Sequence, residues 1–275
     1  MNESITRTLS GIVYIVLLVA ATLYGPLSFI PVFGMFLLIA VYEFCKLNHL
    51  THTVPLIIGF AGIVLFGINI NNNFYSNLLL NLAALLISVN LLFELFKKGA
   101  PSLKDRTAKL ARLIGYVIIP FLLIIKLPFL NYTDTYTYNP YIIIGMFIII
   151  WANDTFAYIV GKTMGRHKLF ERISPKKTIE GFVGGMIFSV AGAYILGQNA
   201  VFNVLTPWQW MAFAAILVVF GTLGDLVESQ LKRNAGVKDS GKIMPGHGGI
   251  LDRLDSVLFA IPFLFLYYQI LNYVS

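Results

Sequence analysis

Long apolar runs separated by short polar links occupy most of this 275-residue chain. A helix that crosses a bilayer needs about 20 apolar residues, which matches the length of these runs. Hydrophobic residues make up 57% of the chain and charged residues 12%, so a soluble surface could not be covered with polar groups. We predict an all-α, polytopic transmembrane bundle of about nine spans, which are 9–25, 28–45, 54–70, 76–96, 111–130, 140–161, 181–197, 208–227 and 255–273.

Two local features refine this prediction. Gly25-Pro26 predicts a tight turn between the first two helices, although these could also be read as one re-entrant pair. The lone Cys45 excludes an intramolecular disulfide. The first apolar run lacks a convincing cleavage site, so we do not expect a signal peptide.

Basic residues are confined almost entirely to one set of links. With nine spans and the N-terminus in the cytoplasm, all but Lys126 of the 20 Lys and Arg residues fall on the inner side. Basic loops stay in the cytoplasm, so this asymmetry predicts the orientation. The inner residues are Arg7 and Lys46, then Lys97, Lys98, Lys104, Arg106, Lys109 and Arg112, then Lys162, Arg166, Lys168, Arg172, Lys176 and Lys177, then Lys232, Arg233, Lys238, Lys242 and Arg253.

The same basic residues suit anionic membrane lipids, each attracting acidic headgroups by about 1 kcal/mol near the surface. For the cluster between 97 and 112, a purely topological role explains the charges as well. Because the charges follow the membrane topology, the net charge of +7 does not indicate nucleic-acid binding.

Asp154 and Asn153 interrupt the otherwise apolar run 140–161. A carboxylate at the centre of a membrane helix costs about 2.5–3.5 kcal/mol, so it normally faces a wet cavity or a partner. Tyr158 lies one turn further on the same face. The sequence leaves two interpretations open, a place in a polar site and a structural contact between helices.

A polar link follows this span. Its glycines and Pro175 predict a loop rather than a helix. Ser174, Lys176, Lys177 and Thr178 combine hydroxyl and ammonium groups, which suit a phosphate. The link lacks the Walker pattern, and on spacing alone a simple basic turn explains it equally well.

The stretch 221–256 carries the most specific pattern. If 208–233 is one helix, Asp225, Glu228, Ser229 and Lys232 share one face. A loop with glycines and charged residues follows, and the last span opens with two further carboxylates one turn apart. These residues are Lys238, Asp239, Lys242, His247, Gly248 and Gly249 in the loop, then Asp252, Arg253 and Asp255.

Two acidic helix faces joined by a glycine-rich basic loop indicate a site for metal-assisted phosphoryl or nucleotidyl transfer. Mg²⁺ takes carboxylate oxygens and bridges them to phosphates, while glycine lets backbone amides approach a phosphate closely. Single residues have simpler interpretations. Asp255 could stabilise a helix N-terminus, Arg253 could pair with Asp252, and His247 could be a loop residue without a ligand role.

The 27 positions 229–255 resemble the diagnostic pattern of the phosphatidate cytidylyltransferases, also called CDP-diacylglycerol synthases. They contain SQLKR, KD and PGHGGILDRLD, and WANDTFAY and SPKKTIEGFVGG resemble the same family. The resemblance covers roughly the C-terminal half. We therefore expect a single membrane domain over 1–275, with generic spans in 1–130 and the catalytic part in 131–275.

The resemblance implies a membrane nucleotidyltransferase of phospholipid biosynthesis that uses CTP, phosphatidic acid and Mg²⁺. By position, Asp225 and Asp252 would hold the metal, joined in our prediction by Asp255. Ser229, Lys232 and Arg233 would complete the catalytic set. Contacts to the substrates would come from Ser174, Lys176, Lys177, Thr178, Lys238, Asp239, His247, Gly248 and Gly249.

The resemblance also implies an integral membrane enzyme, and the distribution of basic residues predicts a multi-pass protein of the cytoplasmic membrane with its active site at the cytoplasmic face. In the family a monovalent cation such as K⁺ can share the site, and the sequence leaves both K⁺ and a homodimer open. A phosphate oxygen of phosphatidate would attack the α-phosphorus of CTP and release pyrophosphate.

Two other functions compete with this interpretation. A CTP-dependent polyprenol kinase would use a similar cluster but attack the γ-phosphate and release CDP. A transporter would use Asp154 as its coupling carboxylate. Transporters often show repeated halves and bind substrate at the midplane, whereas no repeat is visible in this sequence.

Overall fold

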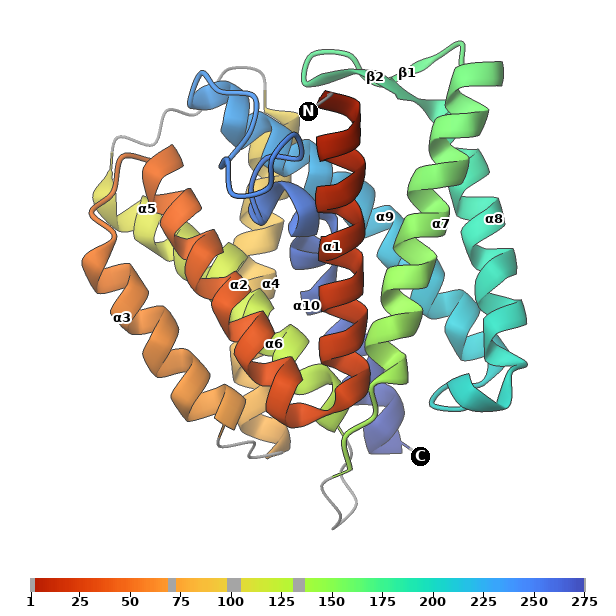
Figure 1. Ribbon diagram of the computed structural model, residues 1–275, viewed down its shortest axis with the longest axis horizontal. Helices are drawn as coiled ribbons and strands as arrows, with labels where there is room; N and C mark the ends of the chain where they lie inside the picture. The colour runs from red at the N-terminus through yellow and green to blue at the C-terminus, as the bar shows by residue number, and fades with distance from the viewer. Residues whose placement is uncertain (1–2, 69–72, 98–104, 131–136, 275) are drawn as a thin grey trace.

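The computed structural model describes residues 3–68, 73–97, 105–130 and 137–274. Within these ranges, eight helices are long and apolar enough to cross a membrane. The all-α polytopic fold is therefore confirmed (Figure 1). The run 54–70 differs from the other eight, because it forms a shorter helix, α3 (Thr53–Gly62), that continues as a π-helical segment, η1 (Ile63–Ile68).

The N-terminal half begins with α1 (Glu3–Tyr24) and α2 (Pro26–Leu47). Only Gly25 separates them, and Pro26 fits the first turn of α2 because that turn needs no donor from it. The predicted tight turn is confirmed. Next come α4 (Phe74–Phe96) and one continuous apolar helical stretch that forms the buried centre of this half. Its segments are α5 (Arg106–Arg112), η2 (Leu113–Ile118), α6 (Ile119–Lys126) and η3 (Leu127–Phe129).

The C-terminal half is built from α7 (Tyr141–Met164), α8 (Ile179–Gly197), α9 (Pro207–Asn234) and α10 (Leu251–Val274). A short 3₁₀ turn, η4 (Ala200–Phe202), precedes α9. The expectation that 208–233 forms one helix is confirmed. The hydroxyl of Thr206 and the side chain of Gln209 form a capping box at the start of α9.

The polar link between α7 and α8 contains a small antiparallel hairpin, β1 (Lys168–Phe170) and β2 (Ser174–Thr178). Thr178 ends β2 and begins α8, since its Oγ1 accepts a hydrogen bond from the N–H of Gly181 at 3.2 Å. The prediction of a non-helical link is confirmed, with the addition of the hairpin. This hairpin fixes the positions of Lys176 and Lys177 relative to α8.

Helix α10 joins the two halves, because it packs against α9 on one side and against α4 and α6 on the other. Figure 1 shows the start of α1, the hairpin and the link between α9 and α10 at one end of the bundle, with the C-terminus at the other. This grouping agrees with the segments predicted to share the cytoplasmic side. Of the predicted basic residues, Lys98 and Lys104 lie outside the described ranges.

Candidate active site

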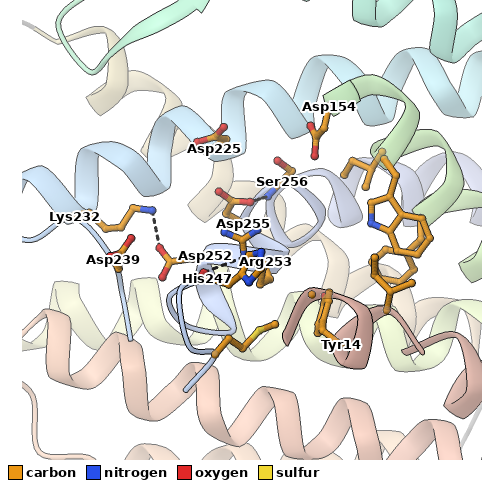
Figure 2. Close-up of a pocket in the computed structure, with 16 residues that line it drawn as sticks. Tyr14, Asp154, Asp225, Lys232, Asp239, His247, Asp252, Arg253, Asp255 and Ser256 are labelled. Carbon is orange, nitrogen blue, oxygen red and sulfur yellow. Dashed lines mark hydrogen bonds and ion pairs between the residues drawn. The ribbon is translucent and has the colours of Figure 1, made fainter. Parts of the chain in front are cut away.

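A polar cavity of about 500 Å³ lies between α1, α7, α9, α10 and the link that follows α9 (Figure 2). Five aspartates line it, together with one lysine and one arginine. The acidic side chains are Asp154, Asp225, Asp239, Asp252 and Asp255. Because carboxylates outnumber the cationic groups, the cavity is suited to bind a cation.

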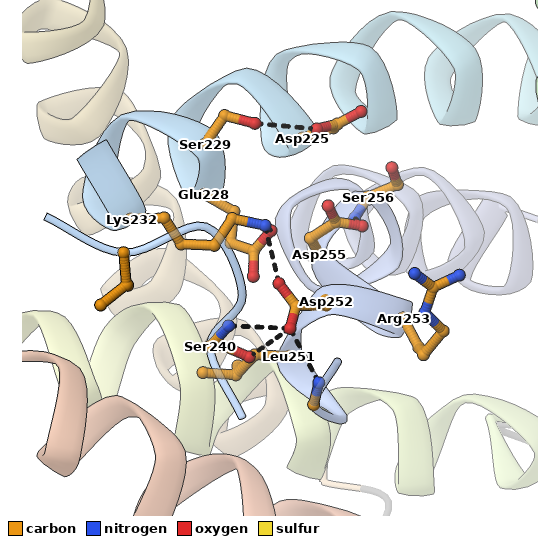
Figure 3. A network of polar contacts seen from close by, with 12 residues as sticks. Asp225, Glu228, Ser229, Lys232, Ser240, Leu251, Asp252, Arg253, Asp255 and Ser256 are labelled. Carbon is orange, nitrogen blue, oxygen red and sulfur yellow. Dashed lines mark hydrogen bonds and ion pairs between the residues drawn. The ribbon is translucent and has the colours of Figure 1, made fainter. Parts of the chain in front are cut away.

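Helix α9 supplies the first acidic face of the cavity. The Oγ of Ser229 donates a hydrogen bond to Oδ1 of Asp225 at 3.2 Å. One turn later, Nζ of Lys232 lies 2.7 Å from Oε2 of Glu228 and 2.7 Å from Oδ1 of Asp252 on α10 (Figure 3). The shared face predicted from the sequence is confirmed, and Lys232 joins it to the second acidic helix.

Asp252 connects α10 to the link that precedes it (Figure 3). Its Oδ2 accepts hydrogen bonds from the N–H of Ser240 at 2.8 Å, the hydroxyl of Ser240 at 2.9 Å and the N–H of Gly249 at 2.8 Å. The side chain is only 4% exposed. Asp252 therefore fixes the shape of the glycine-rich link through Oδ2, while its Oδ1 faces Lys232.

Lys177 of the hairpin reaches the same region and forms an ion pair with Oδ2 of Asp225. Asp255 lies on α10, one turn beyond Asp252, and its Oδ1 accepts a hydrogen bond from the N–H of Ser256 at 2.6 Å. Asp154 of α7 also lines the cavity. This placement favours the polar-site interpretation of Asp154 over a purely structural contact.

A second cavity, of about 350 Å³, adjoins the first between α7, α8, α9 and β2. The two share Ile150, Asp154, Asp225 and Ser256. Its walls are mainly apolar along the helices, and its polar residues include Lys162, Lys176, Lys177 and Thr178. A ligand with a charged head and an apolar body would match this division.

The other residues predicted from the sequence are distributed around these cavities. His247 and Asp239 line both the polar cavity and a third cavity of about 490 Å³ that opens beside it, where Lys238 and Gly248 are also found. Gly249 contributes through its N–H to Asp252. Ser174, Ser229 and Arg233 line none of these three cavities. Arg233 is exposed, and its Nη1 donates to the carbonyl of Val237 at 3.5 Å.

The first helix forms a wall of the polar cavity that the sequence did not predict. Gly11, Tyr14 and Ile15 of α1 line the cavity, and Ser10 Oγ lies 2.8 Å from Nδ1 of His247. The hydroxyl of Tyr14 is buried and has no hydrogen-bond partner among the described residues. In the sequence, α1 is a generic apolar span. The phenol group of Tyr14 is the one feature of that span from which a place in the polar cavity could have been predicted.

His247 lies outside the membrane-spanning segments. Burial lowers the pKa of its imidazole, and the nearby cationic groups of Arg253 and Arg7 lower it further. His247 is therefore neutral near pH 7.

No three carboxylate, imidazole or thiol groups form a ready-made metal site within the described ranges. Mg²⁺, however, is usually held by one or two carboxylates with water and substrate phosphates. Asp225, Asp252 and Asp255 line the cavity, and the buried Oε1 of Glu228 finds no hydrogen-bond donor in the described part of the chain. This donor set fits a hard cation that binds together with a phosphate ligand.

A sequence model of the cytidylyltransferase family matches residues 5–271. The chain belongs to this family. Two similar proteins are each named phosphatidate cytidylyltransferase. Their alignments with this chain span 94% of this chain and 96% of the relative. The protein of Staphylococcus saprophyticus is 36% identical over 260 residues and that of Staphylococcus aureus is 35% identical over 260 residues. A relative of the same name from Staphylococcus epidermidis is 48% identical over 136 residues, which are 50% of this chain and 52% of the relative.

The family match includes α1 and α2 as well as the C-terminal helices. The sequence pattern had linked only the C-terminal half to this family, with 1–130 as generic spans. In this cytidylyltransferase, residues of α1 line the polar cavity together with α9 and α10, so the N-terminal spans contribute to the candidate site.

Proposed function

We propose that the protein transfers CMP from CTP to phosphatidate, giving CDP-diacylglycerol and pyrophosphate. The observation that carries the proposal is the pair of adjoining cavities. One is lined by Asp225, Lys232, Asp252 and Asp255, and the other has mainly apolar walls with Lys176 and Lys177 among its lining residues. A water-soluble nucleotide and a lipid could therefore meet where the cavities join, and relatives named phosphatidate cytidylyltransferase support this reaction.

In this proposal the triphosphate of CTP occupies the polar cavity. Asp225, Asp252 and Asp255 would hold Mg²⁺ there. Bound Mg²⁺ would neutralise negative charge on the triphosphate and make the α-phosphorus more susceptible to attack. Lys232 stabilises the charge that develops on the departing pyrophosphate.

The phosphate of phosphatidate lies beside Lys176 and Lys177, and an acyl chain follows the apolar walls of the second cavity. A phosphate oxygen attacks the α-phosphorus of CTP in line, so a new P–O bond forms while the bond to the bridging oxygen of pyrophosphate breaks. A phosphate monoester is already largely ionised near pH 7, because its second pKa is about 6, so no strong base is required. Positioning and charge neutralisation supply the rate enhancement.

We place this site at the cytoplasmic face of the bacterial cell membrane. The support is the positive-inside distribution of the basic residues, together with the grouping of the hairpin and the link after α9 at one end of the bundle (Figure 1). Anionic headgroups at that face would be attracted to the same basic residues. Neither a K⁺ ion nor a homodimer is part of the proposal.

The proposal is tested by pyrophosphate release from CTP in detergent micelles, with and without phosphatidate. We expect release only when phosphatidate and Mg²⁺ are both present, and its loss in Asp255→Asn. Asp105→Asn is the matched control, since Asp105 caps α5 outside the three cavities and asparagine caps a helix equally well. Release without phosphatidate, or full activity of Asp255→Asn, would contradict the proposed site.

A further inference from the structure

Glu43 is a buried carboxylate in the N-terminal half with no part in the chemistry described so far. It is the one acidic residue of α2 and is 4% exposed. A buried carboxylate is destabilising unless hydrogen bonds or cations satisfy it, so its partners indicate why it is retained.

The carboxylate of Glu43 accepts hydrogen bonds from the start of α10. The N–H of Ile250 donates to Oε1 at 3.2 Å, and the N–H of Leu251 donates to Oε2 at 3.0 Å. The first N–H groups of a helix have no partner within the helix, and they carry its positive dipole end. Glu43 of α2 therefore caps the start of α10, although the bonded residues are 207 and 208 positions apart in the sequence.

A second contact links Glu43 to the candidate active site. The hydroxyl of Ser240 lies 3.4 Å from Oε2 of Glu43 and 2.9 Å from Oδ2 of Asp252, so it stands between the two carboxylates. Asp252 in turn lies 2.7 Å from Nζ of Lys232. A continuous set of polar contacts thus runs from α2 to the polar cavity.

The glycine-rich link is shaped around the same carboxylate. A Cβ atom added to Gly241 or to Gly249 would overlap Oε1 of Glu43. Only glycine lets the backbone approach the carboxylate this closely at both positions. This observation does not depend on the hydrogen bonds, and it too places Glu43 at the centre of the link.

We propose that Glu43 is a positioning residue for the reaction. It holds the link and the first turn of α10 so that Asp252 keeps its orientation toward Lys232 and the cavity. This inference rests on the proposed function, because it assigns Glu43 to the nucleotide side of the site. Glu43 is not among the residues that line the second cavity, between α7, α8 and α9. The affinity of the protein for phosphatidate should therefore not depend on Glu43.

The test compares Glu43→Gln with Glu94→Gln. Glu94 pairs with the buried Arg112 in the same half of the bundle, so the control also loses a partly buried carboxylate, but one without contact to the link. Glutamine has one acceptor oxygen in place of the two of glutamate. Its amide group would therefore face a backbone N–H or the Ser240 hydroxyl where glutamate accepts a hydrogen bond. We expect kcat to fall about 10- to 100-fold in Glu43→Gln, as for loss of an outer-shell partner of a metal ligand. The Mg²⁺ concentration for half-maximal rate should rise, and KM for phosphatidate should stay unchanged.

Hydrogen exchange gives a readout that does not need activity. The N–H groups of Ile250 and Leu251 should exchange faster in Glu43→Gln than in the wild type, and Glu94→Gln should leave them protected. If Glu43→Gln does not fold, Gly241→Ala displaces the carboxylate without removing it and should give the same changes.

Normal kcat in Glu43→Gln, or equal losses in both Gln variants with unchanged Mg²⁺ dependence, would overturn the inference. So would unchanged exchange at Ile250 and Leu251. A wild-type protein that transfers no CMP would instead refute the proposed function, while the exchange experiment would still test the contact.

Discussion

Asp252→Asn is the substitution whose effect the geometry defines most closely. The carboxylate receives four hydrogen bonds, three at Oδ2 and one at Oδ1 from Lys232. Asparagine can keep the three by placing its carbonyl oxygen where Oδ2 lies. Its amide then faces the ammonium group of Lys232, so two donors oppose each other. In the reverse orientation the amide N–H₂ would face the three donors that now bind Oδ2, which would be more destabilising.

The cost follows from the buried ion pair that is lost. Removing one partner of such a pair typically destabilises a protein by about 3–5 kcal/mol. Lys232 keeps its contact with Glu228 at 2.7 Å and is 13% exposed, so we expect the low end, about 3 kcal/mol in the free energy of unfolding. Loss of a preorganised charged contact at a reacting phosphate lowers turnover by about 100-fold or more.

Denaturant titration in detergent micelles measures the stability loss, and the initial rate of CDP-diacylglycerol formation measures turnover. The assay temperature should lie well below the unfolding midpoint of the variant, so that turnover reports on folded protein. Asp105→Asn should leave both quantities unchanged, because asparagine and aspartate cap a helix equally well. If Asp252→Asn retains more than about a tenth of wild-type turnover while folded, Asp252 does not belong to the metal and phosphate site.

Three further predictions concern the walls of the two cavities. Lys177→Ala removes a cation from the second, mainly apolar cavity, so KM for phosphatidate should rise about 10-fold; an unchanged KM for phosphatidate would contradict this placement. Tyr14→Phe should weaken CTP binding by about 2- to 10-fold without lowering stability, because the buried hydroxyl has no hydrogen-bond partner among the described residues. Calorimetric titration measures the affinity and thermal unfolding the stability, and wild-type affinity would exclude a contact. The lowered pKa of His247 means that the folded state binds its proton more weakly than the unfolded state, so stability should fall as pH drops below about 6.5. In His247→Gln the free energy of unfolding should depend less on pH below about 6.5. An unchanged pH dependence would contradict the role given to His247.

Much of the fold followed from the sequence because hydrophobic length alone determines where helices can cross a bilayer. The eight long helices match eight of the nine predicted runs. The helical period also placed Asp225, Glu228, Ser229 and Lys232 on one face, which agrees with the Ser229–Asp225 hydrogen bond and the Lys232–Glu228 ion pair. Short-range periodicity was enough for these features, since each depends on residues within two turns of one another.

The contacts between distant helices could not be predicted in this way. Apolar spans resemble one another in composition, so hydropathy does not say which helix packs against which. Tyr14 and Glu43 were missed for this reason, although Glu43 is a lone carboxylate in an apolar run, the same signal that drew attention to Asp154. Arg233 was expected in the catalytic set with Lys232, but successive residues on a helix are turned by about 100°, and Arg233 is exposed and lines none of the three cavities.

The measurement that tests the central claim most directly is label transfer into lipid. Purified protein is incubated with phosphatidate, Mg²⁺ and CTP labelled at either the α- or the γ-phosphate, and the lipid phase is counted. The proposed reaction places α label in the lipid, leaves γ label in pyrophosphate and stops with EDTA. Transfer of γ label to a lipid alcohol would indicate a kinase. A folded protein that transfers neither label would contradict the enzymatic account and favour a transporter that uses Asp154.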